Sequence, residues 1–183
     1  MSVIEYENDN IRIRYLDGFR RGPRFPRELD GNEAYVKVPG RRISAAAYHH
    51  SAGGFYRGIT AVEKLASYCT AAPTYKVDDA GEPVLNSKGH RIVVGGGRGW
   101  PGIPYTYVIP AYPDLEDGRL VIYKIWHDDW VTWHTGGIYN HHAVGVVVAG
   151  WYASRHDLLS GKDSSARDRP TVEAMTAADE LAD

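Results

Sequence analysis

The stretch Ala143-Val144-Gly145-Val146-Val147-Val148-Ala149-Gly150 decides the fold, because β-branched residues fill it almost without a break. Such a run is typical of a strand that is buried on both faces, in a sheet with helices on either side. The stretch Trp133-His134-Thr135-Gly136-Gly137-Ile138-Tyr139-Asn140 runs into it. Here a histidine lies where small polar residues meet an apolar run, which is where an α/β sheet delivers side chains to a cleft.

The same pattern occurs earlier, in Tyr48-His49-His50-Ser51-Ala52. Residues 43–48 form a short apolar run, which we interpret as a buried strand that ends at the histidine pair. Between the two histidine stretches lies Gly99-Trp100-Pro101-Gly102-Ile103-Pro104-Tyr105-Thr106-Tyr107-Val108-Ile109, whose last five residues predict another strand. Histidine is the commonest metal-binding side chain and the one best suited to exchange protons near pH 7. The pattern therefore predicts chemistry at the ends of strands.

Two helices are predicted, at residues 60–71 and from Pro170-Thr171 onward to Asp183. Thr60 and Glu63 have the spacing of a capping box at the start of the first helix. The turn Asp117-Gly118 introduces a further strand at residues 119–125. We therefore expect an α/β domain over residues 43–183, with a central mixed sheet flanked by helices. The apolar positions that give the first helix its periodicity are Val62, Leu65, Ala66 and Cys69.

Two segments differ from this pattern. Residues 1–42 are polar and rich in arginine, and we expect an N-terminal extension that wraps on the domain and holds one short strand at residues 11–15. Residues 73–98 predict an irregular hairpin that ends in Gly95-Gly96-Gly97. No internal repeat is expected.

Composition excludes several classes of function. The 183 residues fit one domain with a core. A net charge of −2 provides no overall positive field that would attract nucleic acid or anionic lipid. No apolar stretch approaches the roughly 20 residues that span a bilayer. The single cysteine, Cys69, cannot form an internal disulfide and is expected as a small buried apolar residue. We expect neither nucleic acid nor membrane as a partner.

The three stretches, in this order, resemble the zinc-dependent N-acetylmuramoyl-L-alanine amidases, a family that includes phage amidase lysozymes and peptidoglycan recognition proteins. The resemblance covers residues 43–183, within which residues 73–98 are an insertion. It implies an amidase-like fold and a Zn²⁺ cofactor. It also implies hydrolysis of the amide between N-acetylmuramic acid and L-alanine, with peptidoglycan as the partner.

The resemblance also implies roles for particular residues. His49 matches a zinc ligand of the family, and His50 takes the adjacent, non-ligand place. Tyr105 matches a tyrosine whose hydroxyl faces the scissile carbonyl. His134 matches a histidine near the metal that stabilises the tetrahedral intermediate or binds substrate. Without the resemblance, two histidines held by backbone carbonyls and a packing tyrosine remain the alternatives.

Three further residues are candidates for binding substrate. Asn140 lies in the turn that follows His134 in the family pattern, and Trp100 belongs to the Gly-Trp element. Trp133 belongs to an aromatic group, with Trp126 and Trp130, that either packs under the loop or forms a wall for sugar rings. His141 and His142 are expected as solvated loop histidines.

The family carries further zinc ligands after the final helix, namely a histidine and a cysteine or aspartate near a lysine. This sequence stops within that helix, and Lys162-Asp163 comes before it. Three explanations remain open. The sequence belongs to a longer amidase, which we favour because a helix that ends a module should carry a cap. Alternatively, another chain or His141, His142 or His156 supplies the ligands, or the chain is a metal-free peptidoglycan-binding or virion structural module.

The N-terminus agrees with a lysin of phage origin. Residues 1–10 are acidic and lack the basic start and apolar core of a secretory signal. A wall hydrolase without such a signal needs another exit. We expect a phage-encoded enzyme that reaches the wall from the host cytoplasm, or one that the virion carries, with further domains or virion proteins as possible partners.

Overall fold

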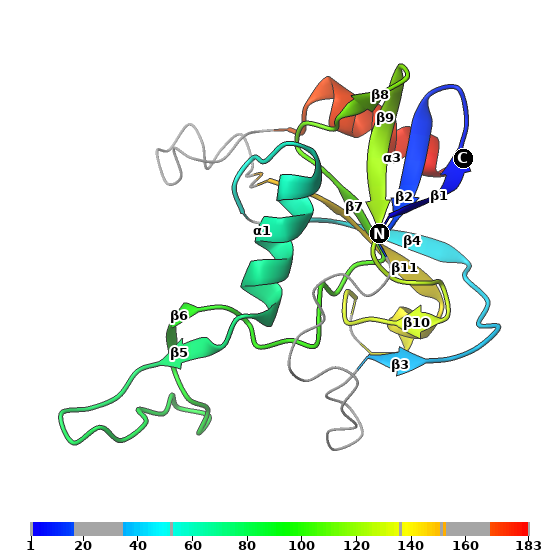
Figure 1. Cartoon of the computed structure of the whole chain (residues 1–183). Helices are drawn as coiled ribbons and strands as arrows, with labels where there is room; N and C mark the ends of the chain where they lie inside the picture. Colours follow the sequence, from blue (N-terminus) through cyan, green and yellow to red (C-terminus); the bar gives the residue numbers. More distant parts are fainter. Residues whose placement is uncertain are drawn as a thin grey trace.

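A mixed β-sheet of seven strands forms the centre of the molecule, in the order β1-β2-β9-β7-β11-β4, with β8 beside β9 (Figure 1). The computed structural model describes residues 2–16, 35–51, 53–135, 137–150, 152 and 169–182. The sheet consists of β1 (Val3–Glu7), β2 (Ile11–Tyr15), β4 (Ala45–His50), β7 (Tyr107–Ile109), β8 (Leu115–Glu116), β9 (Arg119–Lys124) and β11 (Ala143–Val148). β3 (Val36–Lys37) pairs separately with β10 (Trp130–Val131).

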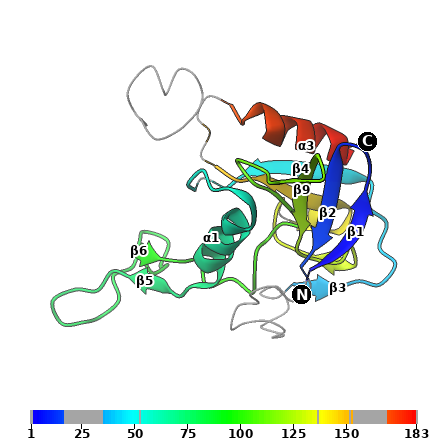
Figure 2. The same ribbon diagram turned by 45° about the horizontal axis from the view of Figure 1, so that its top comes forward.

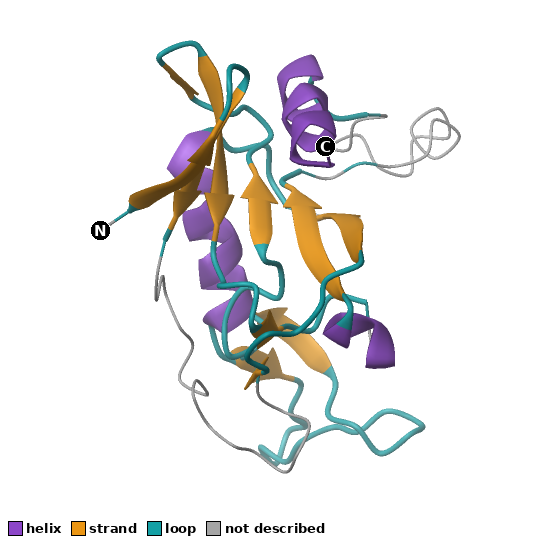
Figure 3. Ribbon diagram, turned by 90° about the vertical axis from the view of Figure 1, so that its right-hand side faces the viewer, coloured by secondary structure: helices purple, strands orange, loops and turns teal. Residues whose placement is uncertain are grey.

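Two helices of the described chain cover opposite faces of this sheet (Figures 2 and 3). On one face α1 (Gly58–Thr70) buries Val62, Leu65, Ala66 and Cys69 against a cluster that includes Val121 and Val147. On the other face α3 (Val172–Ala182) buries three alanines against a cluster that includes Ile122, Val146 and Val148. Neither helix is long and apolar enough to cross a membrane. The expected α/β sheet flanked by helices is therefore present.

The valine-rich run forms β11, which lies in the sheet between β7 and β4. All six residues of β11 are buried, and the strand runs parallel to both of its neighbours, β7 and β4. Val147 packs on the α1 face, while Val146 and Val148 pack on the α3 face. The prediction of a strand buried on both faces is confirmed.

β4 differs from its prediction in position and burial. It spans Ala45–His50, so it continues through the histidine pair instead of ending before it. It is the edge strand of the sheet, and most of its residues are exposed or half-buried. The expectation of a buried strand is wrong, because the apolar run Ala45-Ala46-Ala47 has only one strand beside it.

Two element starts also differ. α1 begins at Gly58 after an N-cap at Arg57 that makes no side-chain capping bond, so the predicted capping box at Thr60 does not form. β7 begins at Tyr107, and Tyr105 therefore lies in the loop before the strand. At the end of the chain Thr171 does act as a cap, because its Oγ1 accepts a hydrogen bond from the amide of Ala174 (3.2 Å).

The N-terminal residues form two strands of the main sheet, where one short strand was expected. β1 and β2 are antiparallel, and β2 pairs in parallel with β9. Ion pairs link the two strands of this hairpin and fasten it to β8 and the turn that follows β8. Arg12 contacts Glu7 (2.9 Å), Glu116 (3.1 Å) and Asp117 (3.0 Å), and Arg14 also pairs with Glu116.

Residues 73–96 form a projection, here named the finger, that extends beyond the C-terminal end of α1 (Figures 1 and 2). Its base is the antiparallel pair β5 (Pro73–Tyr75) and β6 (Val93–Gly96). Beyond the base, three backbone bonds close a ring: Lys76 N to Ile92 O, Ile92 N to Val84 O, and Val84 N to Lys76 O (2.8, 3.1 and 2.9 Å). These three residues are eight positions apart, which indicates a repeat.

The finger contains two hairpins of the same construction, at residues 76–83 and 84–91. Each closes with one bridge, Val77 to Pro83 and Leu85 to Arg91. In the first hairpin Asp78 Oδ1 accepts two backbone N–H bonds, and in the second Asn86 Oδ1 does the same. A glycine with positive φ follows in each turn, Gly81 (85°) and Gly89 (77°). The expectation of no internal repeat is wrong.

Candidate functional site

The three residues singled out by the sequence, His49, Tyr105 and His134, meet on the α1 face of the sheet. The ring centroids of His49 and Tyr105 are 5.2 Å apart, and those of His49 and His134 are 6.0 Å apart. His49 comes from β4, Tyr105 from the loop before β7, and His134 from the loop before the 3-10 helix Gly137–His141. Three separate segments of the chain thus build one site.

The parallel pairing of β4 with β11 directs His49 toward this site. His49 lies beside Val147, and Tyr48 and His50 lie beside Val146 and Val148. Side chains at paired positions share a face of the sheet, so His49 is on the α1 face. Tyr48 is on the α3 face, where its hydroxyl donates to Ala178 O (3.1 Å). The two histidines therefore point to opposite faces.

Tyr105 follows a loop whose backbone is held from several sides. Three buried side chains donate hydrogen bonds to consecutive carbonyls of this loop. The pairs are Tyr35 with Gly102 (2.8 Å), Trp126 with Ile103 (2.7 Å) and Thr132 with Pro104 (2.7 Å). The loop also passes close to Trp126, since a β-carbon at Gly102 would lie 2.7 Å from that ring. These contacts fix where Tyr105 enters the site.

His134 is fixed by its backbone and by its ring. Asn140 Oδ1 accepts hydrogen bonds from the amides of His134 (3.2 Å) and Thr135 (2.9 Å). The ring Nε2 lies 3.0 Å from Ala143 O. A carbonyl only accepts, so Nε2 carries the proton and Nδ1 of the neutral ring has a free lone pair. Gly145 leaves room for the ring, because a β-carbon there would stand 2.8 Å from His134 Cγ.

Two ring nitrogens of this site are buried without a hydrogen-bond partner, His49 Nε2 and His134 Nδ1. Buried polar atoms are normally satisfied, and unsatisfied ones indicate a missing ligand or a catalytic role. Burial lowers the pKa of His49, and the neighbouring His50 lowers it further. Burial also lowers the pKa of His134. Both imidazoles are therefore neutral near pH 7, the form that binds metals and accepts protons.

Tyr105 has the opposite behaviour, because burial raises the pKa of its phenol above the ordinary value of 10. The hydroxyl therefore stays protonated at neutral pH and remains a hydrogen-bond donor. A protonated phenol beside two neutral imidazoles supplies both a donor and an acceptor to one bound group.

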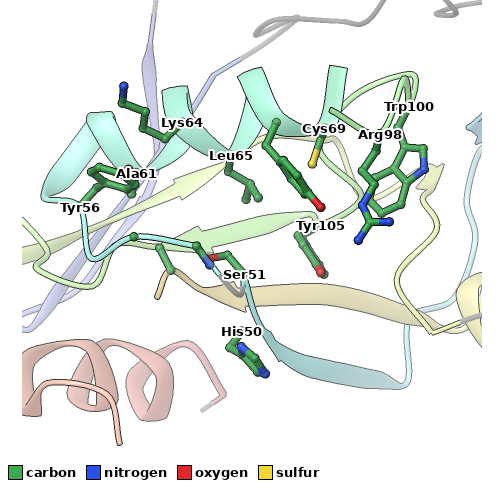
Figure 4. Close-up of a pocket in the computed structure, with 14 residues that line it drawn as sticks. His50, Ser51, Tyr56, Ala61, Lys64, Leu65, Cys69, Arg98, Trp100 and Tyr105 are labelled. Carbon is green, nitrogen blue, oxygen red and sulfur yellow. The ribbon is translucent and has the colours of Figure 1, made fainter. Parts of the chain in front are cut away.

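A cavity of about 450 Å³ adjoins the site between α1 and the loop after β4. Tyr105 and His50 line it, whereas His49 and His134 do not, so Tyr105 joins the cavity to His49 and His134. Figure 4 shows Arg98 and Trp100 at one end of the cavity and Tyr56 at the other. The guanidinium of Arg98 lies 5.7 Å from the Trp100 ring and 5.4 Å from the Tyr68 ring.

The structure separates the predicted substrate-binding residues. Trp100 lines the cavity. Trp133 packs edge-to-face on Tyr35 (5.1 Å) and joins the core cluster on the α1 face. Asn140 is buried, and its side-chain oxygen holds the loop that carries His134. Asn140 is therefore a positioning residue in this structure.

Sequence reasoning missed several residues of the site. Arg98, Tyr56 and Tyr68 line the cavity, and Gly145 makes room for His134. Arg98 could have been predicted as a site residue, because it comes directly before the Gly99-Trp100 element. Gly145 was also visible, as the one residue without a side chain inside a run of valines.

Zinc fits this site only in part. A hydrolytic zinc site uses about three protein ligands, and the unpartnered Nε2 of His49 suits one of them. Among the described residues no group of three or more His, Cys, Asp or Glu side chains is placed to hold a metal. His141 and His142 are exposed, while His156, Lys162 and Asp163 lie outside the described residues. The described side chains therefore supply His49 but not a complete ligand set.

Comparison of the chain with protein-family models, with curated proteins and with solved structures finds no match.

Proposed function

We propose that this chain is a peptidoglycan hydrolase of the N-acetylmuramoyl-L-alanine amidase type, with an amidase-like fold. The observation that carries the proposal is the meeting of His49, Tyr105 and His134, with two unpartnered imidazole nitrogens, at one place on the sheet. The motif resemblance names these same three residues. An endolysin or a virion-associated lysin is the setting in which such an enzyme acts.

The side chains can divide the work of amide hydrolysis. His134 Nδ1 accepts a proton from the attacking water, and the imidazolium that forms donates a hydrogen bond to the developing oxyanion. This proton then passes to the nitrogen of L-alanine, which leaves as a free amine when the C–N bond breaks. Tyr105 donates its hydroxyl proton in a hydrogen bond to the same oxyanion. His49 Nε2 would hold zinc, which when bound would polarise the carbonyl and lower the pKa of water.

The cavity suits a peptidoglycan stem peptide beside the scissile bond. Such a peptide is extended and carries carboxylates, which a guanidinium binds well. Arg98 supplies that cation at one end of the cavity, next to Tyr105. Trp100 and Tyr68 add flat apolar surfaces against which the lactyl and sugar groups can pack.

A non-catalytic peptidoglycan-binding or virion structural module is the alternative. The observation that favours it is the incomplete ligand set among the described residues. The cavity and its arginine would then bind the same peptide without cleaving it.

Product analysis of digested peptidoglycan tests the proposal. An amidase releases peptides with a new free α-amino group on L-alanine and creates no new reducing sugar ends. We expect a low yield of this product from the chain supplied with zinc, because the described ligand set is incomplete, and loss of the product in Tyr105→Phe. New reducing ends would contradict the amidase assignment, and binding of peptidoglycan without any product would favour the binding module.

A further inference from the structure

The two hairpins of the finger carry opposite charge. The first turn contains Asp78, Asp79 and Glu82 and no basic residue, whereas the second contains Lys88 and His90 and no acidic residue. The fold places them equivalently, since both turns follow the same eight-residue construction. The finger is therefore a small two-part unit with an acidic turn and a basic turn.

The charged side chains of the two turns have no oppositely charged partner in the part of the chain that the structure describes. None of the residues 78–90 forms a salt bridge there. Arg91 is engaged differently, over the ring of Tyr75 (5.3 Å). Asp79 and Lys88 occupy the turns themselves, and both are exposed. Each is available to a partner of opposite charge.

The finger also exposes aliphatic side chains. Val77, Leu85 and Val93, which follow the three ring-forming residues of the repeat, are each 54% exposed, and Val94 is 59% exposed. Exposed aliphatic residues gathered on one small projection and rimmed by charges are typical of a protein–protein contact. A partner that covers them removes this apolar surface from water.

We propose that the finger binds the finger of a second copy of this chain, with the acidic turn of each copy against the basic turn of the other. A two-fold axis brings one surface patch against itself, so residue i of one copy meets residue j of the second and j meets i. Across such an axis the acidic turn of each finger meets the basic turn of the other, so one contact contains two pairs of opposite charge. The proposal is independent of the enzymatic function.

Charge exchange between Asp79 and Lys88 tests the proposal in the full chain. Sedimentation equilibrium should detect a dimer of the wild-type chain at low salt. The dimer should weaken at high salt, because the Debye length falls to about 3 Å at 1 M. Asp79→Lys alone places lysine against Lys88 of the second copy, and Lys88→Asp alone places aspartate against Asp79. Both single variants should be monomers.

A mixture of the two single variants provides the decisive control. In a mixed pair, the Asp79→Lys copy has lysine at positions 79 and 88, and the Lys88→Asp copy has aspartate at both. Each of the two contacts therefore joins a lysine to an aspartate. The equimolar mixture should therefore form a heterodimer, and the double variant Asp79→Lys/Lys88→Asp should form a homodimer again. Neither recovery occurs if the variants are merely misfolded.

Three results would overturn the proposal. The first is a wild-type chain that remains monomeric at the highest attainable concentration, which would show that two fingers do not bind each other. The second is a wild-type dimer that persists in both single variants, which would place the contact elsewhere. The third is a mixture that stays monomeric.

Discussion

The imidazole of His134 lies against the backbone of Gly145, so closely that a β-carbon at residue 145 would stand 2.8 Å from Cγ of the ring. Gly145 lies inside the buried strand β11. β11 thus makes room, by lacking one side chain, for the ring of His134, which comes from another segment.

Gly145→Ala should therefore displace His134. We expect turnover of peptidoglycan to fall at least tenfold, since a misplaced catalytic group loses its alignment. Overpacking should cost about 1–3 kcal/mol of unfolding free energy. Gly95→Ala is the matched control, because the nearest atom to its β-carbon would be Thr74 Cβ at 3.9 Å. Equal activity of the two variants would show that the position of His134 does not matter.

Tyr105→Phe removes one hydroxyl and keeps the ring. If the hydroxyl stabilises the oxyanion, kcat should fall by roughly a hundredfold or more while KM changes little. Because burial raises the pKa of Tyr105, activity that depends on this proton should persist up to pH 10 and decline only above it. Steady-state kinetics on a soluble muramyl peptide measures both quantities. An unchanged kcat would reduce Tyr105 to a packing residue.

Much of the fold follows from local patterns in the sequence. The valine run of β11 predicts a buried strand, and the helical spacing of Val62, Leu65 and Cys69 predicts a helix with one buried face. Both predictions are confirmed. The exposure of β4 could not be predicted, because the number of neighbours a strand has is a property of the whole sheet. The finger repeat was missed because its two halves, residues 76–83 and 84–91, share no identical position other than the glycine that each turn requires.

The site was predicted to a similar extent. The three motifs, in their order along the chain, singled out His49, Tyr105 and His134 as candidates, and the structure places these residues together. The roles of Asn140 and Trp133 depend on which groups their side chains meet across the fold, which spacing alone does not encode. Asn140 accepts a hydrogen bond from the backbone of its own loop, and Trp133 packs on Tyr35.

Acid should loosen the N-terminal hairpin through Glu116. Hydrogen bonds from Arg14 and Arg12 hold the pKa of Glu116 below its ordinary value of 4.5. A carboxylate with a lower pKa in the folded state stabilises the fold above its unfolded pKa, and this contribution is lost as pH falls through the folded pKa. Denaturant unfolding between pH 7 and pH 3 should therefore show a steeper loss of stability in the wild type than in Glu116→Gln. Parallel pH profiles would contradict this account.

The central claim is that His49, on the α1 face of the sheet, holds the metal of an amidase site. Zinc binding by isothermal titration calorimetry tests it most directly, in the wild-type chain and in His49→Ala and His50→Ala. His50 is the matched control, because it is the next residue of the same strand and points to the opposite face. The account predicts weak zinc binding in the wild type and in His50→Ala, because the described side chains supply one ligand, and no zinc binding in His49→Ala. Retention in His49→Ala with loss in His50→Ala would contradict it.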